Sequence, residues 1–266
     1  MSLNLKECLF LSDRKTYDNV KRIATNLCYK SDYSTCVPSA IVQIIKEFAD
    51  KNDVIINILN IPLSDDQLWG FFYAIDENYF IVINSDIGLC KQNIALLHEF
   101  YHFYSAIKED KFPFDILFDN KEQKEEDKKA NAFAVNFIMP EEVLRSIFDI
   151  NMDDENKIFA IRTLMEIFHV PFKTAAIRLF EVGIIDESLC NLLINKVPRK
   201  FRDDIESLIE YQEHLDKQSN FAFKDNIQKL NFLFKQSEDL QKMSSKKIAK
   251  QREIVDEILK KLVDQN

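Results

Sequence analysis

Residues 91–108 read KQNIALLHEFYHFYSAIK, a stretch without Gly or Pro that predicts one continuous helix. His98, Glu99 and His102 form the pattern HExxH within it. Side chains four residues apart lie on the same face of a helix, so the two imidazoles can hold one metal ion. Glu99 leaves the helix about 100° from His98 and is therefore free to accept a proton beside that ion.

The HExxH pattern is typical of zinc peptidases, in which the Glu acts as general base on a zinc-bound water. The other interpretation is an amphipathic core helix whose two histidines only form hydrogen bonds. A catalytic zinc site needs a third protein ligand, so the two interpretations differ in what should follow the helix. One group of zinc peptidases continues with a Gly and a third His, but Ser105 and Lys108 stand at those places here.

A carboxylate from a second helix is the remaining source of a third ligand. Residues 121–140 predict a helix that starts highly charged, turns apolar, and stops before Pro140. Its first turns offer four carboxylates among which composition does not choose, namely Glu122, Glu125, Glu126 and Asp127. Asp127 and Asn131 lie one turn apart, so Asp127 can bind the metal while Asn131 orients a histidine.

The rest of the chain predicts short elements around these two helices. In order, we expect helices at 14–29 and 38–50, a buried strand at 54–59, a hairpin of strands at 69–74 and 79–84, and helices at 141–149, 155–168 and 172–182. A strand of the hairpin that lies at an edge beside the HExxH helix is a candidate platform for an extended substrate.

A boundary is predicted near residues 195–200, where VPRK interrupts the helical pattern. We therefore divide the chain into residues 1–150, a metallopeptidase-type domain, residues 151–196, a supporting helical subdomain, and residues 197–266, a helical hairpin or coiled-coil appendage. Apolar residues in the last segment recur in narrow seams at helical spacing. Any homo-oligomer is expected to form through residues 200–266.

Charge and cysteine content narrow the class of protein. A net charge of −9 does not favour non-specific binding to nucleic acid or membrane, and Lys173 and Arg178 alone are a small basic footprint for DNA around the helix at 172–182. No stretch is long and apolar enough for a secretion signal or a membrane span. The five cysteines form no CxxC pair, which predicts reduced thiols and a cytoplasmic protein.

Two segments together resemble the ImmA/IrrE-type metallopeptidases. They are YFIVINSDIGLCKQNIALLHEFYH at 79–102 and DKKANAFAVNFIMP at 127–140, and the family shows a strand ending in Asn, an HExxH helix and an ExxANxFAxxLLMP helix. The likeness spans about residues 15–190. It implies an α+β, mainly helical fold, with a zincin-like metallopeptidase core, a small antiparallel sheet packed on the HExxH helix, and a helical C-terminal region.

The resemblance also implies site residues. His98, His102 and Asp127 would bind Zn²⁺, and Glu99 would be the catalytic base. The family usually has Glu where Asp127 stands, so Glu126 is the alternative third ligand. It often has Gly where Tyr101 stands; we expect Tyr101 and Tyr104 to pack rather than to assist catalysis.

The function implied by the resemblance is a zinc-dependent endopeptidase in transcription regulation, because such enzymes cleave DNA-binding repressor-type regulators. Its protein substrate would be a helix-turn-helix repressor, without direct nucleic-acid binding by the chain itself. The alternative is a non-catalytic regulatory binding protein that uses a zincin scaffold and acts through its C-terminal helices. These two hypotheses differ in whether a partner is cut or only bound.

Overall fold

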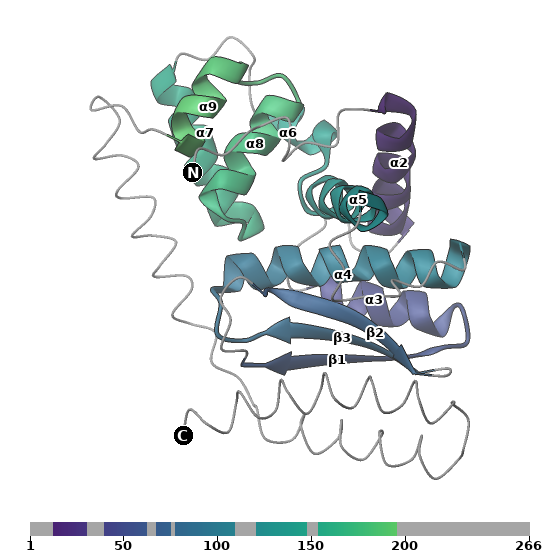
Figure 1. Ribbon diagram of the computed structural model, residues 1–266. Helices are drawn as coiled ribbons and strands as arrows, with labels where there is room; N and C mark the ends of the chain where they lie inside the picture. The colour runs from purple at the N-terminus through teal and green to yellow at the C-terminus, as the bar shows by residue number, and fades with distance from the viewer. Residues whose placement is uncertain are drawn as a thin grey trace.

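The computed structural model describes residues 13–30, 40–62, 68–75, 78–109, 121–147 and 154–195 (Figure 1). The elements in chain order are α2 (Arg14–Lys30), α3 (Ile41–Asp50), β1 (Ile55–Ile61), β2 (Gly70–Ile75), β3 (Asn78–Asn84), α4 (Leu89–Glu109), α5 (Lys121–Ile138), α6 (Glu141–Ile147), α7 (Asp154–Phe168), α8 (Phe172–Glu181) and α9 (Glu187–Asn195). The predicted α+β, mainly helical fold class is confirmed. The predicted domain boundaries at 150/151 and 196/197 fall outside the described residues and stay a prediction.

The sheet is mixed rather than antiparallel. Its strand order is β1-β3-β2, with β3 antiparallel to β2, as the predicted hairpin requires, and parallel to β1. The prediction of an antiparallel sheet considered only the hairpin. After β1 the chain forms β2 at the opposite edge of the sheet. It then turns back as β3 between the two, so β3 runs in the same direction as β1.

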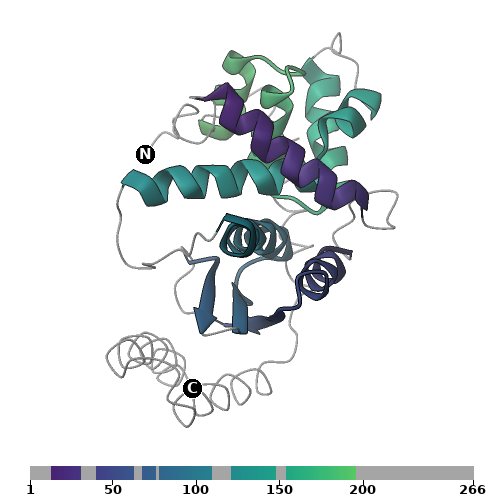
Figure 2. The ribbon, with the colours of Figure 1, turned by 90° about the vertical axis from the view of Figure 1, so that its right-hand side faces the viewer.

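Alternation along the strands divides the sheet into two faces. The ring of Tyr79 lies 5.2 Å from that of Phe103 on α4, so Tyr79 and the residues two and four positions on point toward that helix. Phe72 of β2 also meets Phe103, with ring centroids 6.0 Å apart. Figure 2 shows α3 and α4 side by side on this one face of the sheet.

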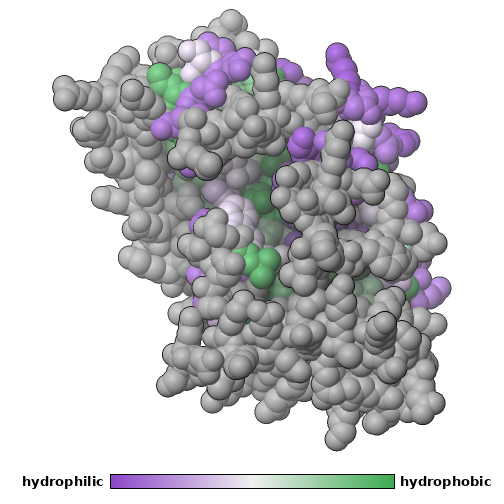
Figure 3. Space-filling model, viewed as in Figure 1, coloured by the Kyte–Doolittle hydropathy of each residue, from purple (hydrophilic) through white to green (hydrophobic). Residues whose placement is uncertain are grey.

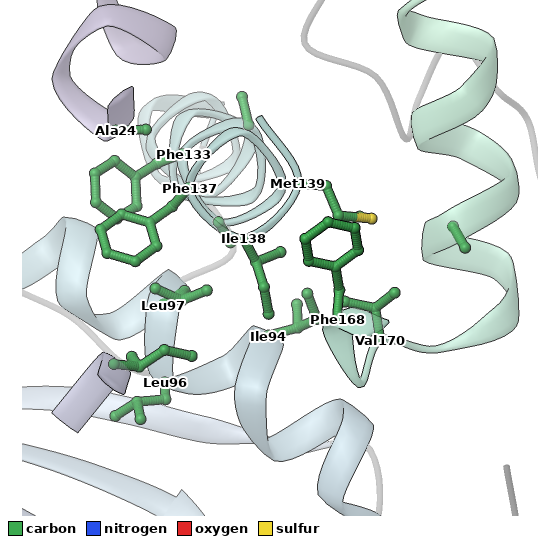
Figure 4. Close-up of a cluster of buried hydrophobic side chains, with 14 of the residues drawn as sticks. Ala24, Ile94, Leu96, Leu97, Phe133, Phe137, Ile138, Met139, Phe168 and Val170 are labelled. Carbon is green, nitrogen blue, oxygen red and sulfur yellow. The ribbon is translucent and has the colours of Figure 1, made fainter. Parts of the chain in front are cut away.

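Helix α5 crosses α4 on the side away from the sheet, and α2 packs against α5 (Figures 1 and 2). The α4–α5 contact is aromatic: Phe100 lies 5.6 Å from Phe133 and 6.1 Å from Phe137 between ring centroids. Figure 4 shows Phe133 and Phe137 directed from α5 toward the helix that carries Leu97. This packing sets the distance between the HExxH helix and the start of α5.

Helices α7, α8 and α9 form a separate group beside the C-terminal end of α5. Helix α9 was not predicted, although its start carries a clear signal: the carboxylate of Asp186 accepts the N–H of Leu189 at 2.8 Å, as an N-cap does. Leu189 and Leu193 of α9 are buried. The helices predicted beyond residue 196 lie outside the described residues.

A buried arginine joins this helical group to α2 and α5. The guanidinium of Arg178 on α8 donates to the Met139 carbonyl and to Oδ1 of Asn136 at the end of α5, and to the hydroxyl of Tyr17 on α2. It also pairs with Glu181 at 2.9 Å, and both side chains are almost fully buried. Arg178 is therefore a packing residue, which removes one of the two cations considered for DNA binding.

The predictions about cysteines and membrane spans can also be compared with the structure. Cys90 and Cys190 are buried thiols outside any disulfide, as expected, but Cys28 is disulfide-bonded, so the prediction of reduced thiols is wrong for that residue. The spacing of cysteines in the sequence does not show which thiols come within bonding distance in the folded chain. Among the described helices, none combines the length and apolar character that crossing a bilayer requires.

Candidate metal centre

Helix α4 brings the two histidines of the HExxH pattern together on one face. Nε2 of His98 lies 3.2 Å from Nε2 of His102, and the two rings are inclined at 63°. The i, i+4 spacing alone accounts for this approach, because it stacks side chains one turn apart. The two nitrogens therefore point toward one common position.

Asp127 of α5 completes a triangle with these nitrogens. Its Oδ1 lies 3.7 Å from Nε2 of His98 and 3.5 Å from Nε2 of His102. In a tetrahedral zinc site with bonds of about 2.1 Å, neighbouring ligand atoms stand about 3.4 Å apart. The three separations match that value within a few tenths of an ångström, so the donor set fits one metal ion.

Asn131 fixes the orientation of His98. Its Oδ1 lies 2.9 Å from Nδ1 of His98, so with the proton on Nδ1 the ring donates to Asn131 and keeps the Nε2 lone pair for a metal. The predicted contact between Asn131 and a histidine is therefore present. One turn of α5 supplies both the carboxylate and the residue that orients its neighbour.

The neighbouring carboxylates of α5 are engaged elsewhere. Glu126 binds Lys129 at 2.6 Å, and Glu125 binds Lys128 at 3.2 Å. In the part of the chain that the structure describes, the group of metal-ligating side chains that comes together contains Asp127 and not Glu126. Packing of Phe133 and Phe137 against α4 turns the Asp127 face of α5 toward the histidines.

The charges of the three groups support one another. Burial acts to raise the pKa of Asp127, but the neighbouring imidazoles of His102 and His98 outweigh it and hold that pKa well below its ordinary value. Burial acts to lower the pKa of His98, but the neighbouring carboxylates of Asp127 and Glu99 outweigh it and raise that pKa. Asp127 therefore keeps its negative charge beside the position that a cation would take.

Glu99 is buried at the interface between α4 and β2. Only 7% of its surface is exposed, and this burial raises the pKa of its carboxyl group, against the opposing charges of His98 and His102. The backbone N–H of Phe72 on β2 donates a hydrogen bond to the carboxylate. A carboxylate with a raised pKa is a stronger proton acceptor, which suits a general base.

Gly70 at the start of β2 lies close against the backbone of β3, beside Glu99. A Cβ atom there would lie 2.8 Å from the backbone oxygen of Val82 and 3.5 Å from Cγ of Glu99. Sequence reasoning missed both Gly70 and the Phe72 N–H. The chain has only three glycines, and one at the start of a strand before an HExxH helix was the available signal.

The metal position is open on the side of α5. The side chain of Asp127 is 44% exposed, against 20% for His98 and 11% for His102. Figure 3 shows a recess between the part that holds α7 and α8 and the part that holds α4. Of the three candidate ligands, Asp127 is therefore the most accessible to solvent.

Tyr101 packs in the core, and Tyr104 is partly buried against it. Tyr101 is 2% exposed, and its ring lies 5.6 Å from Phe133. Burial raises the pKa of its hydroxyl group above the ordinary value. Tyr104 packs against Phe48 at 5.6 Å.

Residues 52–180 match the model of a peptidase family described as the IrrE N-terminal-like domain. This part of the chain belongs to the IrrE N-terminal-like family. No curated protein matches the chain in sequence. The IrrE N-terminal-like domain begins just after α3 and stops in the last turn of α8, so it contains the sheet, Glu99 and all three residues of the triangle. The predicted resemblance to the ImmA/IrrE metallopeptidases is confirmed.

Proposed function

We propose that the protein is a zinc-dependent endopeptidase in which His98, His102 and Asp127 bind Zn²⁺ and Glu99 is the general base. The observation that carries the proposal is the triangle of two Nε2 atoms and one carboxylate oxygen, with edges of 3.2, 3.5 and 3.7 Å, beside a buried glutamate. Two imidazoles and one carboxylate are a donor set of catalytic zinc sites, which leave a fourth position open. The peptidase family of residues 52–180 supports the same reaction class.

In the proposed reaction a water molecule attacks the carbonyl carbon of a peptide bond. A bound Zn²⁺ would supply Lewis acidity, which lowers the pKa of that water and polarises the carbonyl. Glu99 accepts the proton from the water and returns it to the leaving amine, so the C–N bond breaks with the consumption of one water. The Phe72 N–H and the burial of Glu99 hold the carboxylate in place for both transfers.

The family suggests the class of substrate, and the edge strand of the sheet suggests how that substrate could bind. ImmA/IrrE-type enzymes act on DNA-binding repressor-type regulators, so we propose a helix-turn-helix repressor in the cytoplasm as the substrate. Strand β2 lies at an edge of the described sheet, and its Phe72 adjoins Glu99. An extended substrate segment can therefore lie along β2 with its scissile bond near the base.

Metal analysis together with a cleavage assay tests the proposal. Purified wild-type protein is expected to hold one zinc per chain and to cleave a co-encoded helix-turn-helix repressor, with loss of cleavage on chelation and recovery on addition of Zn²⁺. Asp127→Ala is expected to lose the metal, because two imidazoles alone leave the triangle open. Glu126→Ala is the matched control and should keep it.

Three outcomes would contradict parts of the proposal. Iron rather than zinc in the purified protein would indicate the other chemistry that two histidines and a carboxylate support. Retention of metal by Asp127→Ala but not by Glu126→Ala would move the third ligand to Glu126. A repressor that binds to the zinc-loaded protein without being cut would favour the non-catalytic binding protein.

Replacing Asn131 with Ala is expected to weaken zinc binding by about 10- to 100-fold, because His98 loses the partner that fixes its tautomer. Competition with a chromophoric chelator measures the affinity. Asn131→Asp keeps an acceptor oxygen and should bind zinc close to the wild-type affinity. Asn19→Ala, which removes a surface amide that contacts Arg22 on α2, serves as the neutral control. Equal affinities for Asn131→Ala and the wild type would remove Asn131 from the site.

A further inference from the structure

The face of the sheet that points away from α4 carries four buried apolar side chains; we call it the outer face. Because Tyr79 points toward α4, Phe80 and Val82 point the other way. Leu59 pairs with Val82 in the sheet, so Leu59 and Ile61 lie on the same face. These four side chains are only 1–3% exposed: Leu59, Ile61, Phe80 and Val82.

None of the described helices covers the outer face. Figure 2 shows α3, α4 and the helices beyond them on the opposite side of the sheet. The contiguous core around α4 includes Tyr79, Ile81 and Ile83, but not Phe80 or Val82. Ile55 is on the same face of β1 as Leu59 but is 62% exposed, as expected for a position on this face that nothing covers. Another part of this chain must therefore bury the other four side chains.

Chain length and pattern select the segment. Apart from the N-terminal residues 1–12, every stretch before residue 196 that lies outside the described part joins two described elements. Residues 197–266 are much the longest remaining segment, and Phe223, Ile227, Leu230 and Phe234 recur in it at the spacing of one helix face. We propose that residues 197–266 dock on the outer face of the sheet through this apolar seam.

The proposal links the C-terminal segment to the strand that holds the catalytic base. Tyr73 of β2 lies on the outer face, with its ring 6.3 Å from that of Phe80, while the backbone N–H of its neighbour Phe72 donates to Glu99. A segment docked on the outer face would pack against β2 on the side opposite α4. It makes the C-terminal segment part of the enzyme core rather than an independent appendage, and it holds whether or not the protein cuts a substrate.

Photo-crosslinking in the full-length protein tests the docking. Phe80 is replaced by p-benzoylphenylalanine, which keeps an aromatic ring, and the crosslinked peptides are identified by tandem mass spectrometry. We expect intrachain crosslinks from position 80 to peptides of residues 197–266. The matched control carries the same crosslinker at Tyr79, which faces the other way and should react with peptides of α4.

A second position guards against a folding defect at the buried site. Tyr73 lies on the same face and is partly exposed, so the crosslinker there should also reach residues 197–266. Crosslinks to residues 1–12 would overturn the proposal, as would crosslinks between differently isotope-labelled copies, which would identify a second chain as the occupant. Absence of crosslinks to residues 197–266 from both outer positions, with the Tyr79 control reacting, would also overturn it.

Discussion

Replacing Glu99 with Gln is expected to slow peptide cleavage by about 10²- to 10⁴-fold while zinc content stays the same. The amide has nearly the same shape as the carboxylate but does not accept a proton from the attacking water. Glu99 lies outside the triangle of candidate ligands, so its charge is not needed to hold the metal. Initial rates at saturating substrate and metal analysis of the same preparation measure the two quantities.

The fold is expected to tolerate this substitution. Burial raises the pKa of Glu99, which means that its ionised form is less stable in the folded protein than in water, and Gln removes that cost. Glu126→Gln, on the neighbouring helix, is the matched control and should cleave at the wild-type rate. Wild-type activity in Glu99→Gln would rule out Glu99 as the base, whereas loss of zinc would show that it contributes to metal binding.

Replacing Arg178 with Met is expected to lower the free energy of unfolding by about 3–5 kcal/mol. The substitution leaves Glu181 buried without its cation, and leaves the Met139 carbonyl and the Asn136 amide without their donor. A loss of this size is a large fraction of the roughly 5–15 kcal/mol that stabilises a typical domain. Chemical denaturation followed by circular dichroism measures it.

The matched control is Arg162→Met on α7. Arg162 also pairs with a glutamate, Glu166 at 2.9 Å, but about half of its side chain is exposed. Exposed pairs contribute little, so this variant should stay within about 0.5 kcal/mol of the wild type. An equal loss in the two variants would contradict the role assigned to the buried position.

A double variant separates the orphaned charge from lost packing. Arg178→Met combined with Glu181→Met removes both charges and should be more stable than Arg178→Met alone, because no unpaired carboxylate remains inside. If the double variant is no more stable than the single one, the orphaned carboxylate is not the cause of the loss, and the lost hydrogen bonds of Arg178 to α2 and α5 account for it instead. In either case Arg178 links α8 to the C-terminal end of α5, the helix whose first turns carry Asp127.

Much of the fold was predictable because it depends on local periodicity. The helices α2, α4, α5, α7 and α8 and the β2–β3 hairpin lie where apolar spacing placed them, within a few residues. The missed elements depended on other signals. Helix α9 begins with an Asp186 cap in a short segment, and the parallel pairing of β1 with β3 joins residues more than twenty positions apart.

Within the site, the sequence by itself determined the pairing of the two histidines and the glutamate beside them, because one turn of helix sets the i, i+4 distance whatever the surroundings. It also identified the family through two motifs. It favoured Asp127 as the third vertex, with Glu126 as the alternative, and it did not show that β2 holds Glu99. Only the tertiary structure shows that the carboxylate of Asp127 meets the two histidines, since aromatic packing of α5 on α4 selects the face that carries it. Such contacts join distant segments, and local periodicity does not encode how helices and strands pack against one another.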